Sequence, residues 1–371
     1  MEILTFIIPF IILLTVVVFV HEYGHYYFAK KYGVGVTDFS IGFGKEIFGF
    51  NDKSGTRWKF CAIPLGGYVK FFGDRNVFSQ AEQEELLKRY DKIDQQKLFV
   101  TKPLYQRTLI VFAGPLANFI LAILIFSSIY IFSGKDFTPA QITEVQNGSP
   151  AHSAKIKSGD IILSINDKKV GSILDVSTYI NTSTTDEIKI NVSRNDEELV
   201  FNVIPQKIKT EDSLGNVINK KIIGIKIAPP NNEFNRERLG PATAIYYAVK
   251  ETWFVTKASF DFIVSLTRGK GDTSQLGGPI KIAKITGQVA QIGFVAFLSI
   301  MAYISISLGF INLLPIPMLD GGHLMFYAFE KVLGRPLTQK TQEGFFRIGL
   351  FLLIFLMLFT TINDLKDLGL F

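Results

Sequence analysis

The chain opens on an apolar run that leads without a break into a metal-binding pattern: Ile3-Leu-Thr-Phe-Ile-Ile-Pro-Phe-Ile-Ile-Leu-Leu-Thr-Val-Val-Val-Phe-Val20, then His21-Glu22-Tyr23-Gly24-His25. A helix that spans a bilayer needs about 20 apolar residues, so this run predicts a membrane helix. Positions i and i+4 share one face of a helix, so His21 and His25 can bind one zinc ion with Glu22 beside it. The alternative is a chance pair of interfacial histidines, but ionisable groups at membrane depth are costly and usually mark a functional site.

The composition indicates a protein with both membrane-embedded and aqueous parts. Hydrophobic residues make up 48% of the 371 residues, and charged residues make up 19%. The net charge of +6 does not indicate a nucleic-acid partner, because the basic residues are dispersed and form no cluster interleaved with aromatic residues. The single cysteine, Cys61, excludes an internal disulfide.

Three further apolar stretches give the predicted fold class, a polytopic α-helical membrane protein with four transmembrane helices. The predicted spans are residues 1–30, 108–133, 294–323 and 343–363. The first span is predicted to be retained and not cleaved as a signal peptide, because no basic residue precedes it and no small-residue cleavage site follows it.

Lysine and arginine residues predict the orientation of these spans. Residues 31–107 hold thirteen of them and residues 331–347 hold four, whereas the segment through Val20 holds none and the tail after Thr361 holds only Lys366. Cytoplasmic loops carry the excess of positive charge. Both termini are therefore predicted to be extracytoplasmic, in a multi-pass protein of the bacterial cytoplasmic membrane.

Three regions outside the spans have patterns of their own. Within the predicted cytoplasmic segment 31–107, two alternating runs around the turn Asn51–Gly55 predict a membrane-associated β-hairpin, and residues 80–96 predict a surface helix or, in the preferred interpretation, a solvated connector. Residues 140–207 alternate short β-branched runs with turns and predict one compact extracytoplasmic α+β domain. Residues 240–270 predict an amphipathic helix at the membrane interface.

A catalytic zinc ion ordinarily has three protein ligands, so a third ligand is expected in another span. Asp320 is the carboxylate candidate, because it follows two prolines that break the third span and precedes Gly321 and Gly322, which are expected to loosen the backbone. His323 is the rival third ligand. We favour Asp320, because a buried carboxylate requires a cation.

Other polar residues have less specific roles. Asn312, about two helical turns before Asp320, is expected to hydrogen-bond the substrate backbone or a developing oxyanion, with helix–helix contact as the alternative. Asn118 is expected to bond across between helices at least as readily as to a substrate. Gly24 permits close helix contact or access of water, and His152 is expected at the surface.

Taken together, the motifs resemble those of the bacterial site-2 proteases of the regulator-of-sigma-E protease type. They are His-Glu-x-x-His, Gly42-Phe-Gly44 with Pro64-Leu-Gly-Gly-Tyr-Val-Lys70, Gly114-Pro-Leu-Ala-Asn118, Leu276-Gly-Gly-Pro-Ile280, and Asn312-Leu-Leu-Pro-Ile-Pro-Met-Leu-Asp-Gly-Gly-His323. The resemblance implies Zn²⁺ held by His21, His25 and Asp320, with Glu22 as the catalytic base and Asn312 positioning the substrate.

The resemblance also implies a PDZ-like fold for the extracytoplasmic domain, with Lys155 where a glycine is usual and one such domain where well-known members carry two. It further implies single-pass membrane proteins as substrates, cut within the bilayer in regulated intramembrane proteolysis, for example of an anti-sigma factor or of remnant signal peptides. The alternatives are a membrane-anchored zinc protease of another class, with a glutamate as third ligand, and a non-catalytic scaffold with a PDZ-like domain.

Overall fold

The computed structural model describes residues 2–73, 90–183, 185–211, 217–230, 233–269, 273 and 276–367. Two compact units make up the chain: residues 1–125 with 278–362, and residues 126–277 with 363–371. Within the described residues, four helices are long and apolar enough to cross a membrane, and they coincide with the four predicted spans. Most of the predicted connector at residues 80–96 lies outside the described residues.

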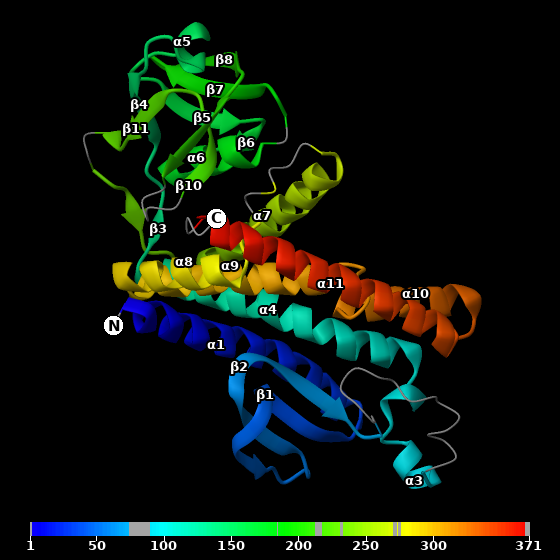
Figure 1. Ribbon diagram of the computed structural model, residues 1–371. Coiled ribbons are helices and arrows are strands. Elements are labelled where there is room, and N and C mark those ends of the chain that lie inside the picture. The colour runs from blue at the N-terminus through cyan, green and yellow to red at the C-terminus, as the bar shows by residue number, and fades with distance from the viewer. Residues whose placement is uncertain are drawn as a thin grey trace. The chain divides into compact units, whose positions relative to one another are not determined.

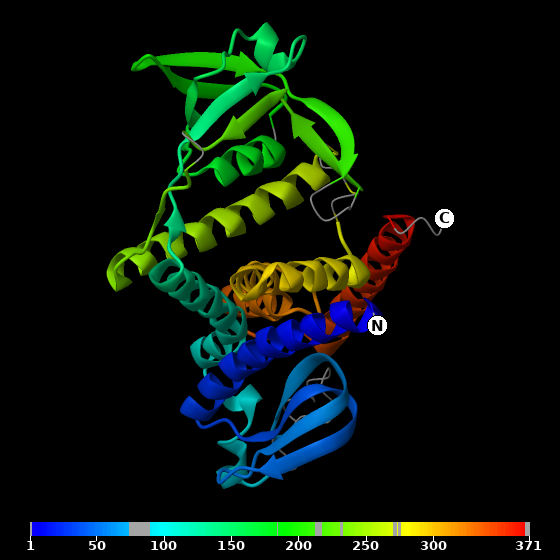
Figure 2. The same cartoon turned by 90° about the vertical axis from the view of Figure 1, so that its left-hand side faces the viewer.

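The first unit consists of helices and one β-hairpin (Figures 1 and 2). Its helices are the candidate spans α1 (Glu2–Lys31), α4 (Leu104–Phe132), α9 (Phe294–Asn312) and α11 (Gln339–Asp367), the shorter helices α3 (Lys92–Gln95), α8 (Pro279–Ile292) and α10 (Asp320–Leu333), and the 3-10 turn η1 (Phe99–Thr101). The C-terminal ends of α4 and α11 belong to the second unit.

Helix α1 packs against α8 and α9, and its glycine brings it close to α4. A Cβ atom at Gly24 would lie 2.3 Å from the carbonyl oxygen of Ala113, so any other residue would force the two helices apart. Of the two roles expected for Gly24, the structure shows close helix contact. Helix α8 has no counterpart among the predicted elements.

The third predicted span, 294–323, is not one continuous helix. Helix α9 ends at Asn312, before Pro315 and Pro317, and α10 begins at Asp320. The expectation that Gly321 and Gly322 loosen the backbone is wrong. Both are buried in the first turn of α10. A Cβ at Gly321 would lie 2.2 Å from the Leu314 oxygen, and a Cβ at Gly322 would lie 2.5 Å from the Ile316 oxygen. The two glycines therefore leave room for the loop that folds back over the helix.

The predicted hairpin corresponds to β1 (Val36–Asn51) and β2 (Arg57–Phe71), which pair antiparallel around the turn after Asn51. The first half of β1 lies between two segments of β2, since Phe39 pairs with both Val69 and Trp58. Residues 67–71 therefore form one edge of a curved sheet, and residues 48–51 form the other. Gly42 permits the reversal in β1, with φ of +86° and no room for a Cβ beside the Ile63 oxygen.

Asp52 fixes this hairpin to helix α1. Its carboxylate accepts hydrogen bonds from the Ser54 and Thr56 backbone amides at the turn, from the Tyr26 hydroxyl at 2.8 Å and from the Trp58 indole at 3.1 Å. Burial alone would raise the pKa of this carboxyl, but these hydrogen bonds hold it well below its usual range. Since Tyr26 directly follows His25, the turn holds the hairpin beside the histidine pair.

A β-rich domain and helix α7 (Pro241–Thr267) form the second unit. The main sheet has the order β11-β4-β5-β7-β8, with β6 paired to β5, and all of its pairs are antiparallel. Its strands are β4 (Ala140–Val145), β5 (Ile161–Ile165), β6 (Lys168–Lys169), β7 (Ile188–Arg194), β8 (Glu197–Val203) and β11 (Ile225–Ala228). The unit also contains α5 (Pro150–Ser153), α6 (Ile173–Thr182), the hairpin β9 (Gln206–Glu211) and β10 (Val217–Ile222), and the pair β3 (Lys135–Asp136) and β12 (Arg236–Glu237).

The predicted C-terminal boundary of this domain, residue 207, is too early. Strand β11 pairs with β4, and Ile223 lies in the same buried core as Ile142 and Ile190. The hairpin between β8 and β11 is polar, a pattern typical of a connector. The four-residue strand after it is too short to give a signal of its own.

A buried ion pair closes one end of the β-rich domain. The Asp160 side chain is fully buried and accepts hydrogen bonds from Arg194 Nε at 2.6 Å, Arg194 Nη2 at 2.7 Å and the Lys157 amide at 2.9 Å. Burial alone would raise the pKa of the Asp160 carboxyl, but the Arg194 guanidinium holds it below its usual range. Arg194 also donates to the Lys155 carbonyl. Lys155 has φ of +64°, so the lysine keeps the left-handed conformation that a glycine adopts without cost.

Helix α7 packs part of its aromatic surface against the β-rich domain. Tyr247 contacts Phe137, and Phe254 contacts Tyr179 of α6. Other apolar side chains on α7 are exposed, namely Ile245, Tyr246, Val249, Trp253 and Phe260. Helix α7 therefore has two apolar surfaces. One packs against the β-rich domain, and only the exposed one is available to a membrane interface.

Candidate active site and metal centre

The two histidines of the His-Glu-x-x-His pattern lie together on α1. Their Nε2 atoms are 3.2 Å apart. This spacing follows from the helix, because i and i+4 side chains lie one above the other. His21 is buried, and His25 is half-buried.

Asp320 completes a group of three possible metal ligands. Its Oδ2 atom lies 3.1 Å from His21 Nε2 and 3.5 Å from His25 Nε2. One atom from each of the three residues lies within 4.8 Å of the others. The Oδ2 atom is buried and accepts no hydrogen bond from any residue that the structure describes. Two imidazoles and a carboxylate are a donor set of catalytic zinc sites, and a cation would satisfy the unpaired oxygen, so these residues fit Zn²⁺.

Helix α4 supports both histidines from behind. His25 Nδ1 lies 2.9 Å from the Ile110 carbonyl oxygen, and His21 Nδ1 lies 3.2 Å from the side-chain amide of Asn118. A Cβ at Gly114 would lie 2.2 Å from His25 Nε2, so only glycine leaves the imidazole its place. The sequence pointed to Asn118 as a polar residue in an apolar span, but it held no signal for the Ile110 carbonyl, which is a backbone group.

Glu22 lies between α1 and the hairpin, half-buried. A Cβ at Gly67 would lie 3.1 Å from Glu22 Cγ, so the glycine lets the edge strand of the hairpin lie against this side chain. Glu22 is not part of the three-residue ligand group. Its carboxylate instead faces the edge strand, where the Val69 backbone amide donates to it, so it is available for a role other than metal binding.

Asn312 lies beside the ligand group. It is the last residue of α9, and its Nδ2 atom is 3.4 Å from His21 Nε2. The end of a broken helix thus brings an amide to the side of the site that faces the imidazole nitrogens. This position suits a group that binds substrate.

The other two histidines lie apart from this group. The His323 ring packs against Phe326 and Phe346, with centroids 6.3 Å and 5.6 Å away, and His323 is not among the three clustered ligands. His152 is exposed on the β-rich domain, as expected from the sequence.

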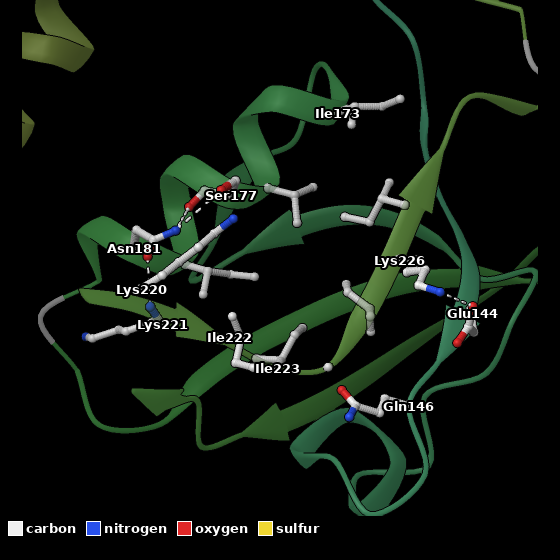
Figure 3. A pocket seen from close by; sticks show the side chains of 15 residues that line it. Glu144, Gln146, Ile173, Ser177, Asn181, Lys220, Lys221, Ile222, Ile223 and Lys226 are labelled. Atoms are coloured by element: carbon white, nitrogen blue, oxygen red, sulfur yellow. Dashed lines mark hydrogen bonds and ion pairs between the residues drawn. The ribbon is translucent and has the colours of Figure 1, made fainter. Parts of the chain in front are cut away.

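A second concave feature lies within the β-rich domain. A groove of about 640 Å³ runs between α6 and residues 220–227, with Ile173, Val176 and Ile180 on the helix side (Figure 3). Lys220, Lys221 and Lys226 lie along it, and Lys226 is paired with Glu144 at 2.6 Å. The groove is apolar at its base and basic along its length, and it holds none of the residues predicted for the chemistry.

Four helices apolar enough to cross a membrane, with a His₂-carboxylate group and Glu22 beside it, are the features of a membrane metallohydrolase. The family model for peptidase family M50 matches residues 9–356. The chain belongs to this family, the site-2 proteases, and is a zinc metalloprotease. The non-catalytic scaffold and the zinc protease of another class are therefore set aside.

Relatives of similar length carry metalloprotease names. The chain is 42% identical to a zinc metalloprotease of Agrobacterium fabrum, Atu1380, over 98% of this chain and 96% of that protein. It is 37% identical to a zinc metalloprotease of Rickettsia conorii, RC0203, over 98% of this chain and 99% of that protein. It is 35% identical to the metalloprotease MmpA of Caulobacter vibrioides, over 98% of this chain and 96% of that protein.

Among solved structures, the PDZ domain of an SdrC-like protein from Listeria monocytogenes matches part of the chain. The match has a TM-score of 0.20 and 23% identity, and it covers 24% of this chain and 88% of that domain. At this TM-score the match does not assign the fold of the β-rich domain.

Proposed function

We propose that this zinc metalloprotease cleaves transmembrane segments of single-pass membrane proteins, with His21, His25 and Asp320 as the zinc ligands and Glu22 as the catalytic base. The observation that carries the proposal is the position of the three clustered ligand atoms. Two come from the apolar helix α1, and the third follows the apolar helix α9. A substrate must therefore reach the site at or near membrane depth.

Bound zinc lowers the pKa of water and polarises a peptide carbonyl. Beside it, Glu22 is placed to take a proton from the attacking water and to deliver it to the leaving amide nitrogen. Asn312 is placed to hydrogen-bond the substrate carbonyl or the developing oxyanion. The half-buried position of Glu22 against Gly67 keeps it close to any backbone that lies along the hairpin.

The substrate must unwind before its backbone reaches the site, since a transmembrane helix has all of its backbone groups paired internally. Residues 67–71 of β2 pair with β1 on one side only, within the described strands, and Gly67 contacts Glu22. We infer that an extended substrate segment adds to this edge, which supplies the hydrogen bonds lost on unwinding. The edge ends beside the catalytic base, so strand addition also sets which peptide bond is cut.

The first experiment is Glu22→Gln in the full-length protein. Cleavage of a membrane substrate should fall by about 100-fold to 10,000-fold, the range for loss of a general base. Bound zinc should stay at the wild-type level, because Glu22 lies outside the ligand group. Undiminished cleavage by the zinc-loaded variant would remove Glu22 from the mechanism.

Proline substitutions test the edge strand. Val69→Pro should reduce cleavage and leave zinc in place, whereas Phe48→Pro on the opposite edge of the same sheet should have little effect on cleavage. Equal rates for both variants would limit the hairpin to a structural role.

For the membrane topology we propose that both termini are extracytoplasmic and the hairpin is cytoplasmic, in the bacterial cytoplasmic membrane. The sole cysteine provides a native reporter, since Cys61 is partly exposed on β2. A membrane-impermeant maleimide should label it in inverted membrane vesicles and not in intact spheroplasts. Labelling with the reverse preference would invert the orientation.

For the β-rich domain we propose a PDZ-like fold that limits substrate access. It would exclude proteins with bulky outer domains and admit trimmed ones, while α7 would lie at the membrane interface on its exposed aromatic side. The alternative is recruitment, in which the groove between α6 and residues 220–227 binds a newly exposed C-terminus.

A deletion separates exclusion from recruitment. Gln141 and Ala228 are cross-strand partners, so a short Gly/Ser linker can replace residues 140–228. Exclusion predicts that the deleted enzyme keeps zinc and cuts untrimmed substrates. Loss of cutting of a trimmed substrate, with zinc retained, would favour recruitment.

A further inference from the structure

The side-chain amide of Asn118 lies beside His21 with its nitrogen toward the imidazole and its oxygen unpaired. The side chain is fully buried in α4, with its Nδ2 atom 3.2 Å from His21 Nδ1. Its Oδ1 atom is also buried and has no hydrogen-bond partner among the described residues. A buried amide oxygen without a partner costs about 1–3 kcal/mol, so an asparagine in this place calls for an account.

The tautomer of His21 supplies that account. His21 Nε2 faces His25 Nε2 and Asp320 Oδ2, and is therefore the metal-binding nitrogen in the proposed centre. A neutral imidazole that binds metal through Nε2 carries its proton on Nδ1 and must donate there. An amide nitrogen cannot accept this proton. The two ends of an asparagine amide have nearly the same shape, so exchanging them brings the oxygen to His21 Nδ1, where it can accept this proton.

His25 has the same arrangement with a different acceptor. Its Nδ1 atom lies 2.9 Å from the Ile110 carbonyl oxygen, two turns before Asn118 on the same helix. Helix α4 thus offers one oxygen to each proton-bearing nitrogen. The backbone oxygen at Ile110 is fixed by the helix, but the oxygen for His21 depends on one side chain.

Asn118 is itself held in place by α9. Its backbone carbonyl accepts a hydrogen bond from the buried Ser305 hydroxyl at 2.9 Å. A Cβ at Gly309 of α9 would lie 3.2 Å from Asn118 Cβ. These contacts hold the backbone and Cβ of Asn118 against α9, and so place its amide beside His21. We propose that Asn118 is a positioning residue, whose side-chain oxygen accepts the Nδ1 proton of His21 and so fixes the imidazole for zinc binding.

This inference rests on the metal centre proposed above, and it differs from a role in helix packing alone. A packing role requires only the volume of the side chain and bonds across the helices. A positioning role requires an acceptor oxygen at His21 Nδ1. Zinc affinity separates the two, because a group that supports a metal ligand typically contributes 10-fold to 100-fold in metal affinity.

The test uses full-length protein in detergent, with zinc dissociation constants measured by competition against a chelator. Asn118→Leu keeps the volume and removes the acceptor, and should weaken zinc binding by about 10-fold to 100-fold. Asn118→Asp keeps an acceptor oxygen at the same position and should remain within about 3-fold of wild type, less than the loss expected from the leucine variant. The absorption spectrum of the Co²⁺-loaded protein should change in the leucine variant and not in the aspartate variant.

Thermal unfolding of the metal-free proteins controls for packing, and Asn118→Ala replaces the leucine variant if that one does not fold. His21→Ala in the same assay tests the metal centre itself. Loss of zinc from His21→Ala with wild-type affinity in Asn118→Leu would overturn the role of Asn118 and leave the centre intact. Equal losses in the leucine and aspartate variants would also overturn it, since the acceptor would then not matter.

Discussion

Two aspartates, the buried Asp160 and the half-buried Asp320, lie in different units of the chain and have opposite surroundings. Asp160 in the β-rich domain faces both nitrogens of one edge of Arg194 and a backbone amide, so its charge is fully balanced by the protein. Asp320 in the helical unit faces two imidazole nitrogens at 3.1 Å and 3.5 Å, and its Oδ2 accepts no hydrogen bond among the described residues. Both aspartates have a buried carboxylate oxygen, but only the carboxylate of Asp160 has its hydrogen-bond partners supplied by the protein.

The difference separates a structural carboxylate from a functional one. A buried charge must be paired, because removing it from water costs several kcal/mol. Arg194 meets this need permanently, whereas the two imidazoles leave Asp320 Oδ2 without a hydrogen bond, and a bound cation would complete its pairing. Incomplete pairing of a buried oxygen is therefore the observation that supports the proposed metal centre.

The largest expected effect is that of Asp320→Ala. Zinc affinity should fall by more than the roughly 100-fold that loss of a supporting residue costs, and proteolytic activity should fall with it. Asp160→Ala should retain zinc, because its partners lie outside the ligand group. Metal analysis of the two purified variants checks this contrast, and equal zinc contents would remove it.

Asp160→Ala should instead destabilise the β-rich domain. Breaking a buried pair costs about 3–5 kcal/mol, and the lower end applies here because Arg194 is partly exposed. Hydrogen exchange of β5 and β7 in the full-length protein should accelerate accordingly. The matched control is Asp167→Asn, which breaks the exposed pair with Lys189, suits the positive φ of +61° at this position and should cost less than about 1 kcal/mol. Similar exchange in both variants would show that burial of the Asp160 pair contributes nothing.

Lowering the pH should weaken the same ion pair without a substitution. The pKa of Asp160 is lowered in the folded domain, so the pair contributes its full stability above the unfolded value of about 4 and loses it as the pH falls further, through the folded pKa. Protection of β5 and β7 from hydrogen exchange, corrected for intrinsic rates, should decrease below about pH 4 in the wild type. In Asp160→Asn this part of the pH dependence should be flatter. An unchanged profile would mean that other groups cause the acid sensitivity.

The smallest effect is expected for His323→Ala. Its ring packs against Phe326 and Phe346 outside the ligand group, so most of the zinc should remain. Loss of a partly buried ring should cost about 1–3 kcal/mol in stability. Zinc loss as large as that of Asp320→Ala would transfer the role of third ligand to His323.

The sequence alone predicted the elements whose signals are local. A long apolar run predicts a spanning helix, i and i+4 histidines predict a shared face, and alternating runs around Asn51–Gly55 predict a hairpin. Asp320 could be inferred because a lone carboxylate in an apolar region requires a cation. These arguments needed no knowledge of tertiary contacts.

What the sequence left open depends on contacts between distant segments. Helix α8 is short and amphipathic, and its packing against α1 gives it its place in the fold. Strand β11 is only four residues long, and its pairing with β4 defines it. The acceptor for His25 is a backbone carbonyl, which no residue type reveals. The role of Gly321 and Gly322 follows from a loop that folds back on them, and its path is a property of the tertiary fold.

In the proposed mechanism, the position of Asn312 and Asp320 in the chain also sets when the site can be completed during synthesis. Asn312 lies 291 residues after His21, and Asp320 follows it. At about 5–20 residues per second, a ribosome adds that length in roughly 15–60 s. Throughout that time the histidines are already made but have no carboxylate partner. A nascent or prematurely terminated chain therefore lacks Asp320, and in the proposed mechanism such a chain cannot complete its zinc site.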